Sequence, residues 1–358
     1  MCKTILYIHF HPSHYSDKLD FIKEQLSSLS YKTELGKTCA VHYLLNNNLE
    51  FNEQYESIQL ISRKLSRWAF LILAVQYIKT NKCKYVIIHG LDYFLEAVFI
   101  KWFSGSKVII QHHAEKTYLR KKARLMPWAD KWIDAYFFNG KNVALPFIQK
   151  KCIASISKVY EVVEGSSNFK LQSAKKTGSF KQLVFIGRLN PNKNLMTLLK
   201  AILILKTMRS DFHLSVYYTS TELEKELKIY CKQNGITDTI TFKGSVPKSE
   251  IESALNRSDI FVSCSLYEGS GYSLIEALAC GTFPVVSHIP AFDFILENLI
   301  DKEQFEPISE TELAHKLNKA LNGSFTNQRK ETIRKHFDNK CSDQAIVLQI
   351  ENALTQLV

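Results

Sequence analysis

Two glutamates lie eight positions apart around a short glycine-containing segment, Glu268-Gly-Ser-Gly-Tyr-Ser-Leu-Ile-Glu276. The apolar run at 259–265 predicts a short buried strand before the segment, and the residues up to Gly281 indicate a helix after it. In a parallel α/β sheet, such a strand-to-helix turn lies at the carboxyl edge, where ligands bind. Gly271 allows backbone N–H groups to approach an anion, and a helix N-terminus favours negative charge. The segment therefore predicts a site for an anion flanked by two carboxylates.

The same residues also have a purely structural interpretation. Ser273-Leu-Ile-Glu276 has the pattern of a capping box, in which Ser273 is the N-cap and Glu276 reaches back to its N–H group. In that case Glu276 only begins a helix, and Glu268 is a solvated loop acid. The segment alone leaves both interpretations open.

A pair of cations lies about eighty residues upstream, in a similar setting. The residues at 182–188 predict a buried strand that runs into a turn, and those at 195–205 predict a helix. Arg188 and Lys193 flank the loop between them, where a guanidinium fork and an ammonium could together bind a diphosphate. The alternative is two surface cations near a helix start, which the helix dipole mildly disfavours.

Four short patterns follow one another in the second half of the chain. They are Gly-Arg-Leu-x3-Lys from Gly187, Phe-x-Gly-x-Val from Phe242, Glu-x7-Glu from Glu268, and Glu-Ala-x-Ala-x-Gly-x2-Pro-Val-Val from Glu276. In this order, over residues 180–290, they resemble the nucleotide-sugar half of the retaining glycosyltransferases of family 4. The N-terminal half is similar only in general layout. The resemblance implies an α/β protein with the GT-B fold, in which two Rossmann-like doubly wound domains face each other across a cleft.

The resemblance also implies roles for individual positions. Arg188 and Lys193, with the adjacent Gly187, would bind the diphosphate of a sugar-nucleotide donor and stabilise it as it departs. Glu276 would accept hydrogen bonds from the ribose hydroxyls, and Glu268 would contact the transferred sugar.

Backbone groups complete the donor site that the resemblance implies. The N–H groups around Gly271, Tyr272 and Ser273 would meet the sugar or the distal phosphate, while Gly244 and Val246 would lie near the nucleobase. The sequence departs from the family in three ways: Ser270 replaces a common aromatic residue, Asn194 replaces a common glycine, and two residues separate Gly281 from Pro284 where the family usually has one. Ser270 leaves the identity of the sugar open.

Histidines follow two predicted strands of the N-terminal half. His112 and His113 come directly after the strand at 107–111, and the resemblance suggests that His113 approaches the transferred sugar. Three further histidines surround the loop after the first strand and are assigned to the acceptor side: His9, His11 and His14. We expect no metal site among them, because their spacing in a loop imposes no ligand geometry.

The implied reaction moves a sugar, of the hexosyl type, from a nucleoside diphosphate sugar to a hydroxyl acceptor with retention of configuration. A glycan or a lipid-linked precursor in cell-surface polysaccharide synthesis is the expected acceptor. The chain contains no Asp-x-Asp sequence, so we expect neither a metal nor another cofactor. Two alternatives remain: a related sugar-nucleotide epimerase or phosphorylase, and a non-catalytic scaffold that binds a nucleotide sugar or a membrane.

The length of 358 residues predicts about two domains. Strands alternate with helices in both halves, which indicates parallel sheets. We expect an acceptor domain at 1–168, a donor domain at 169–341, and a helix at 342–358 that packs back on the first domain. Residues 52–80 are expected to be mostly helical.

The net charge of +11 is concentrated in the first half: residues 101–160 hold twelve lysines and arginines against three acids. Residues 116–132, where cations alternate with Trp128 and Trp132, suggest contact with an anionic membrane surface or a lipid-linked acceptor. An ordinary solvated helix face is the alternative, and no nucleic-acid module accompanies the charge.

The eight cysteines are dispersed, which is typical of reduced core residues in a cytoplasmic protein. We expect the protein to lie in the cytoplasm, in part at the inner face of the membrane. The longest apolar run, from Trp68 to Val75, is too short to cross a bilayer and predicts a buried helix.

Overall fold

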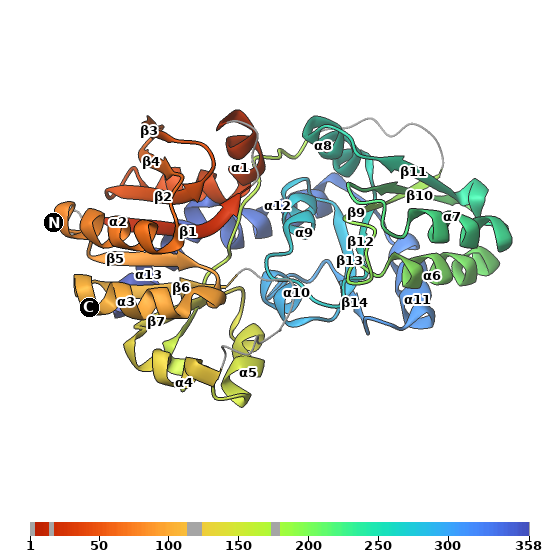
Figure 1. The fold of residues 1–358 in the computed structure, drawn as a ribbon. Coiled ribbons are helices and arrows are strands. Elements are labelled where there is room, and N and C mark those ends of the chain that lie inside the picture. Colours follow the sequence, from red (N-terminus) through yellow and green to blue (C-terminus); the bar gives the residue numbers. More distant parts are fainter. Residues whose placement is uncertain (1–3, 14–17, 113–123, 173–179, 358) are drawn as a thin grey trace. The chain divides into compact units, whose positions relative to one another are not determined.

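The computed structural model describes residues 4–13, 18–112, 124–172 and 180–357. The chain forms two compact units, one made of Met1–Ser166 with Ser342–Val358 and the other of Ser167–Cys341 (Figure 1). Each unit has a largely parallel sheet with helices, which confirms the predicted pair of Rossmann-like doubly wound units.

The first unit is built on an eight-stranded sheet in the order β3-β4-β2-β1-β5-β6-β7-β8. Its strands are β1 (Ile5–Ser13), β2 (Val41–Asn47), β3 (Phe51–Tyr55), β4 (Ile58–Arg63), β5 (Tyr85–His89), β6 (Lys107–Gln111), β7 (Ala135–Phe138) and β8 (Val159–Glu161). Its α-helices are α1 (Lys18–Leu35), α2 (Arg67–Thr80), α3 (Phe94–Ser104), α4 (Met126–Ala129), α5 (Lys141–Gln149) and α13 (Asp343–Gln356). Short 3₁₀ turns are η1 (Leu91–Tyr93), η3 (Asp130–Trp132) and η4 (Ile156–Lys158).

The expectation of a mostly helical segment at 52–80 is wrong for its first part. β3 pairs antiparallel with β4, and β4 pairs parallel with β2, so this part of the chain extends the sheet. Ile58 and Leu60 of β4 are fully buried, which shows that burial on the sheet determines the conformation here. Only α2 is helical.

The last helix of the chain belongs to the first unit. α13 buries one side, including Ile346, Ile350 and Leu354. The hydroxyl of Ser30 in α1 donates to Asp343 Oδ1 at 2.8 Å, and the hydroxyl of Tyr85 in β5 donates to the Leu354 carbonyl at 3.1 Å. Segments from the two ends of the chain therefore share one core. None of the helices in the described part of the chain is long and apolar enough to cross a membrane.

The second unit has a six-stranded parallel sheet in the order β11-β10-β9-β12-β13-β14. Its strands are β9 (Lys181–Ile186), β10 (Phe212–Tyr217), β11 (Ile240–Gly244), β12 (Ile260–Ser263), β13 (Phe283–Ser287) and β14 (Glu303–Phe305). Its helices are α6 (Leu195–Met208), α7 (Glu224–Gln233), α8 (Lys248–Arg257), α9 (Tyr272–Ala279), α10 (Pro290–Ile295), α11 (Glu310–Leu321) and α12 (Asn327–Lys340), with the 3₁₀ turn η5 (Thr237–Thr239).

The strand order of the second unit reverses between β9 and β12. From β9 the chain builds outward through β10 to β11, then returns to β12 on the other side of β9 and continues to β14. The loops that leave β9 and β12 therefore diverge from neighbouring strand ends. Ligands of open α/β sheets bind at such a switch point, outside the carboxyl ends of the strands.

Candidate functional site

The loops after β9 and β12 are joined by hydrogen bonds at the switch point. The backbone N–H of Leu266 donates to the Asn192 carbonyl at 2.8 Å, and the side-chain amide of Asn192 donates to the Tyr267 carbonyl at 2.9 Å. Two segments more than seventy residues apart in sequence are thereby held side by side. They carry Arg188 and Lys193 on one loop and Glu268 on the other.

The structure brings Lys193 and Glu268 into direct contact. The Lys193 ammonium forms an ion pair with Glu268 Oε1, and the side chains are only 12% and 5% exposed. The hydroxyl of Ser265 donates to the same oxygen at 2.6 Å. Because burial in a low-dielectric environment strengthens charge interactions, this pair fixes a lysine ammonium at the sheet edge. Lys193 is therefore not the surface cation of the alternative interpretation, whereas Arg188 is exposed.

The loop that carries Lys193 has a defined backbone conformation. The backbone N–H of Lys193 donates to Asn190 Oδ1 at 3.0 Å, and Asn194 adopts the left-handed conformation with φ 48° and ψ 44°. Asparagine tolerates this conformation better than most residues. The amide of Asn194 also donates to the Pro307 carbonyl at 3.0 Å, so the loop is anchored on both sides of Lys193.

Helix α9 begins at Tyr272, with Gly271 as its N-cap in the left-handed conformation at φ 67°. The capping-box interpretation is therefore wrong: Ser273 lies inside the first turn, and Glu276 is one turn further along. A Cβ on Gly271 would come within 3.1 Å of the Phe292 and Ile295 side chains. Gly271 is needed for both its conformation and its close packing, and the helix N-terminus that it begins is suited to an anion.

Glu276 lies partly buried on α9. Burial raises the pKa of its carboxyl group to about 7, and the charge of Lys248 opposes this shift. Over the part of the chain that the structure describes, the carboxyl group of Glu276 has neither a hydrogen bond nor an ion pair. A carboxylate in such surroundings is suited to accepting hydrogen bonds from the hydroxyls of a ligand.

The remaining predicted donor-site residues lie at the same carboxyl edge. Gly187 follows β9 directly, and its N–H donates to the Tyr217 carbonyl of the adjacent β10 at 3.1 Å. Gly244 ends β11 with φ +71°, and Val246 lies in the short connection to α8. Since β10 and β9 separate β11 from β12, these two residues lie further along the edge than the Lys193–Glu268 pair.

Of the predicted histidines, His112 is buried and packs on aromatic rings. Its ring stacks on Phe138 with the centroids 4.8 Å apart and contacts Phe147 edge-on at 5.3 Å. His9 lies beside His89, at 5.6 Å between ring centroids. His113 and His14, and the side chain of His11, lie outside the described residues.

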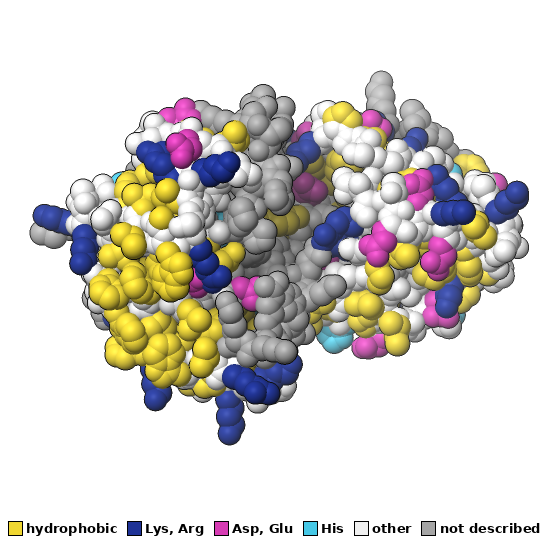
Figure 2. Space-filling model, viewed as in Figure 1, with side chains coloured by type: hydrophobic (Ala, Val, Ile, Leu, Met, Phe, Trp, Pro, Cys, Tyr) yellow, Lys and Arg dark blue, Asp and Glu magenta, His cyan; other side chains and the backbone are white. Residues whose placement is uncertain are grey.

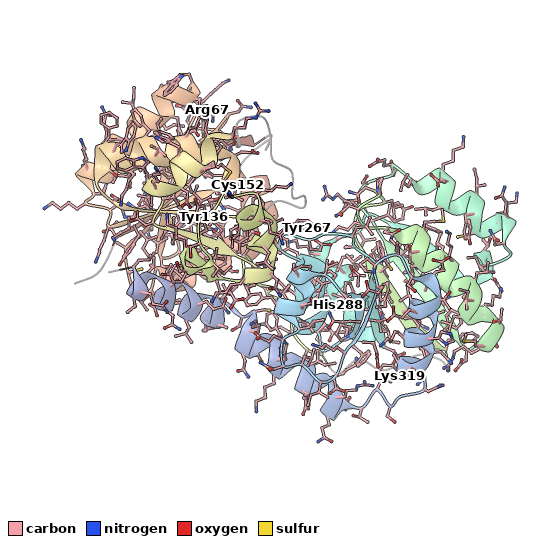
Figure 3. All side chains as sticks on the ribbon, turned by 90° about the horizontal axis from the view of Figure 1, so that it is seen from below. Arg67, Tyr136, Cys152, Tyr267, His288 and Lys319 are labelled. Carbon is pink, nitrogen blue, oxygen red and sulfur yellow. The ribbon has the colours of Figure 1, made fainter. Side chains whose placement is uncertain are left out.

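Sequence reasoning missed three residues that bear on this site. Ser265 holds Glu268, and its place at the strand end, three residues before the glutamate, was the available signal. Lys248, at the start of α8, affects the pKa of Glu276 from a different loop. Tyr267, which Figure 3 labels, has a buried hydroxyl with no hydrogen-bond partner among the described residues, and burial raises its pKa to about 12.

The fold and the site together define a protein of the GT-B type: Rossmann-like units, with paired charges and a glycine-capped helix at a sheet switch point. Residues 167–337 match the family described as "Glycosyl transferases group 1". The matched residues coincide with the second unit and include Arg188, Lys193, Glu268 and Glu276.

Curated relatives match over part of their length. A GDP-mannose:cellobiosyl-diphosphopolyprenol alpha-mannosyltransferase of Xanthomonas campestris is 25% identical over 111 residues, which are 31% of this chain and 29% of the relative. The chain thus aligns with less than a third of that protein.

Solved structures are similar over the whole chain. A glycosyltransferase of Rickettsia africae has a TM-score of 0.77 at 14% identity, with 99% of this chain and 98% of that chain covered. The Anabaena protein HepE, solved in complex with UDP and glucose, has a TM-score of 0.72 at 12% identity, with 99% and 100% covered. At these identities the similarity shows the fold.

Proposed function

We propose that the protein is a retaining glycosyltransferase that moves a hexosyl group from a nucleoside diphosphate sugar to a hydroxyl acceptor. The observation behind the proposal is the Lys193–Glu268 ion pair at the switch point. Arg188 lies in the same loop as Lys193, and Glu268 shortly precedes Gly271, the N-cap of α9. The family match of residues 167–337 supports the same reaction class.

The charges account for how the bond to the leaving group would be broken. In the transition state the departing diphosphate gains negative charge, and Arg188, Lys193 and the N-terminus of α9 supply fixed positive potential for it. Because Lys193 is already held by Glu268, it needs little reorganisation when that charge develops. These protein cations take the role of a divalent metal in the proposed reaction.

The carboxylates bind the rest of the donor in this proposal. Glu276 accepts the ribose hydroxyls, and Glu268 contacts the transferred sugar while orienting Lys193. Gly244 and Val246 contact the nucleobase, and the N–H groups around Gly271, Tyr272 and Ser273 bind the distal phosphate or the sugar. The predicted approach of His113 to the transferred sugar is also part of this proposal.

For the acceptor we propose a glycan or a lipid-linked precursor of a surface polysaccharide. The name of the Xanthomonas relative specifies a diphosphopolyprenol acceptor, and that relationship supports a lipid-linked substrate here. The complex of the Anabaena protein with UDP and glucose supports a sugar-nucleotide donor.

Arg188→Ala tests the diphosphate assignment. Loss of one transition-state contact is expected to lower kcat/KM about 10²–10³-fold with unchanged fold, because the side chain is exposed. Turnover is measured over a panel of UDP-, GDP- and ADP-sugars with and without acceptor. Lys200→Ala, which removes an exposed cation from the middle of α6, serves as the control and should leave turnover unchanged.

The same panel separates the competing functions. Conversion of the donor to an isomer without acceptor would indicate an epimerase. Consumption of the donor that requires inorganic phosphate would indicate a phosphorylase. If every donor binds but none turns over, the protein is a scaffold. If Arg188→Ala turns over the preferred donor as the native chain does, the diphosphate assignment is wrong.

A further inference from the structure

All four tryptophans of the chain lie exposed on the first unit. Their exposed fractions run from 40% for Trp132 to 70% for Trp68. With two neighbouring apolar side chains they form a set that we call the aromatic patch: Trp68, Ile72, Trp102, Phe103, Trp128 and Trp132.

The patch is continuous over adjacent elements. The Trp102 ring lies edge-on to Trp128 at 5.8 Å and to Trp132 at 5.4 Å between centroids, which joins α3 to α4 and η3. Helix α3 also packs against α2, which carries Trp68 and Ile72 one turn apart on its outer side. Figure 2 shows the hydrophobic side chains gathered over α2, α3 and α4.

Helix α2 shows that the patch is more than incidental exposure. The sequence predicted a buried helix, and Phe70, Leu71 and Ala74 are indeed buried. Trp68 and Ile72 are nevertheless exposed, so the first turns of α2 carry large apolar side chains on the outer side as well as the inner. A contiguous exposed apolar patch marks an interaction surface.

The charges of the same elements have one sign at the surface. Over α2, α3, α4 and η3, each fully described, the only acids are Glu96 and Asp130, and both are buried. Glu96 pairs with Arg67 and Asp130 with Lys158. On these elements the exposed charged residues are the cations Arg67, Lys79 and Lys131. Next to them, the exposed Arg124 precedes α4 and the exposed Asp92 precedes α3. Figure 3 shows Arg67 at the outer edge of its unit.

We propose that the aromatic patch docks on an anionic lipid bilayer. Tryptophan is enriched at membrane–water interfaces, where its ring meets acyl chains and its N–H stays hydrated. Lysine and arginine beside such aromatic residues add attraction to anionic headgroups. A protein partner would supply apolar contact but gives no reason for the excess of exposed cations over exposed acids around the patch. The proposal does not rest on the glycosyltransferase activity.

The tryptophans make the docking directly measurable. The full chain is mixed with vesicles of phosphatidylcholine alone, or of equal parts phosphatidylcholine and phosphatidylglycerol, and bound protein is separated by flotation. We expect binding to the phosphatidylglycerol vesicles, weakened by salt, with a blue-shifted tryptophan emission that brominated acyl chains quench. Since every tryptophan lies in the patch, quenching reports this surface and no other part of the chain.

Two sets of variants separate the apolar contribution to membrane binding from the electrostatic one. Trp68→Gln/Ile72→Gln is expected to lower the partition coefficient on the order of tenfold, because apolar insertion is lost. Arg124→Gln/Lys131→Gln removes charges that each contribute about fivefold. The control, Ile300→Gln/Ile308→Gln, alters side chains of the second unit that are 93% and 74% exposed, and should bind as the native chain does.

The proposal is overturned if the native chain binds neither vesicle, or binds both equally. It is also overturned if Trp68→Gln/Ile72→Gln binds undiminished, or if sedimentation shows a native dimer that this variant dissociates, since a second copy then covers the patch. No donor or acceptor is present in these measurements. Their failure therefore leaves the proposed sugar transfer intact, and loss of turnover in Arg188→Ala says nothing about docking.

Discussion

At the scale of single residues, the site depends on a buried ion pair. Lys193 and Glu268 are each nearly covered, and Ser265 supplies a second hydrogen bond to Glu268 Oε1. Removing one partner of a buried pair leaves an uncompensated charge, which costs more than removing both. Lys193→Met is therefore expected to destabilise the second unit by about 3 kcal/mol, measured as lost hydrogen-exchange protection in β9 and β12.

The double variant Lys193→Met/Glu268→Gln serves as the control. It also removes the Glu268 carboxylate charge, which the single variant leaves without a partner. The double variant should therefore regain most of the lost stability, while sugar transfer stays absent. If the single variant keeps its protection, the pair does not contribute to the fold, and Lys193 is the surface cation of the alternative interpretation.

The residue types of this pair could be predicted, but their contact could not. Spacing and motif order place Lys193 and Glu268 at strand ends of one domain. Their separation across the sheet depends on strand order, and only the adjacency of β9 and β12 brings the two loops together. The sequence pattern carries no information on that adjacency apart from the family resemblance.

At the scale of elements, the start of α9 depends on Gly271. A side chain at this position would impose the left-handed conformation on an L-residue and would crowd Phe292 and Ile295. Gly271→Ala is expected to lower the free energy of unfolding by about 1–2 kcal/mol from the backbone alone, plus a packing penalty. Urea unfolding followed by far-ultraviolet circular dichroism measures this loss.

Gly235→Ala is the matched control. Gly235 has a similar φ of +63°, but a Cβ there meets nothing within 4 Å. Its loss of stability isolates the backbone penalty, and the difference between the two variants gives the packing penalty. Equal losses would show that Phe292 and Ile295 adjust freely, and would weaken the argument that α9 begins at a closely packed turn.

The sequence-based predictions were wrong for the elements whose conformation depends on tertiary contacts. The turn between β3 and β4 consists of Glu56 and Ser57, with Glu56 at φ 48°, and it lacks the Asn-Gly signal of a two-residue hairpin. The Ser273–Glu276 capping pattern is present in the sequence, but the left-handed Gly271 starts α9 two residues earlier. The alternation of strands and helices elsewhere was predictable, because apolar periodicity reports burial directly.

At the scale of the whole molecule, the chain leaves the first unit once and returns to it with α13. Ile350 of that helix is buried in the first unit, and the N–H of Val163 donates to Gln349 Oε1 at 2.9 Å. The stability of the first unit therefore depends on residues that follow the entire second unit in sequence. Ile350→Ala leaves a cavity and is expected to destabilise the first unit by about 3 kcal/mol.

The tryptophans again supply the measurement, since all four report on the first unit. Ile350→Ala should lower the urea midpoint detected by tryptophan fluorescence. Leu317→Ala, an equally buried change in α11 of the second unit, should leave that midpoint in place and lower only the transition detected by circular dichroism. If both variants shift both signals together, the two units unfold as one cooperative body, and α13 couples them instead of belonging to the first unit alone.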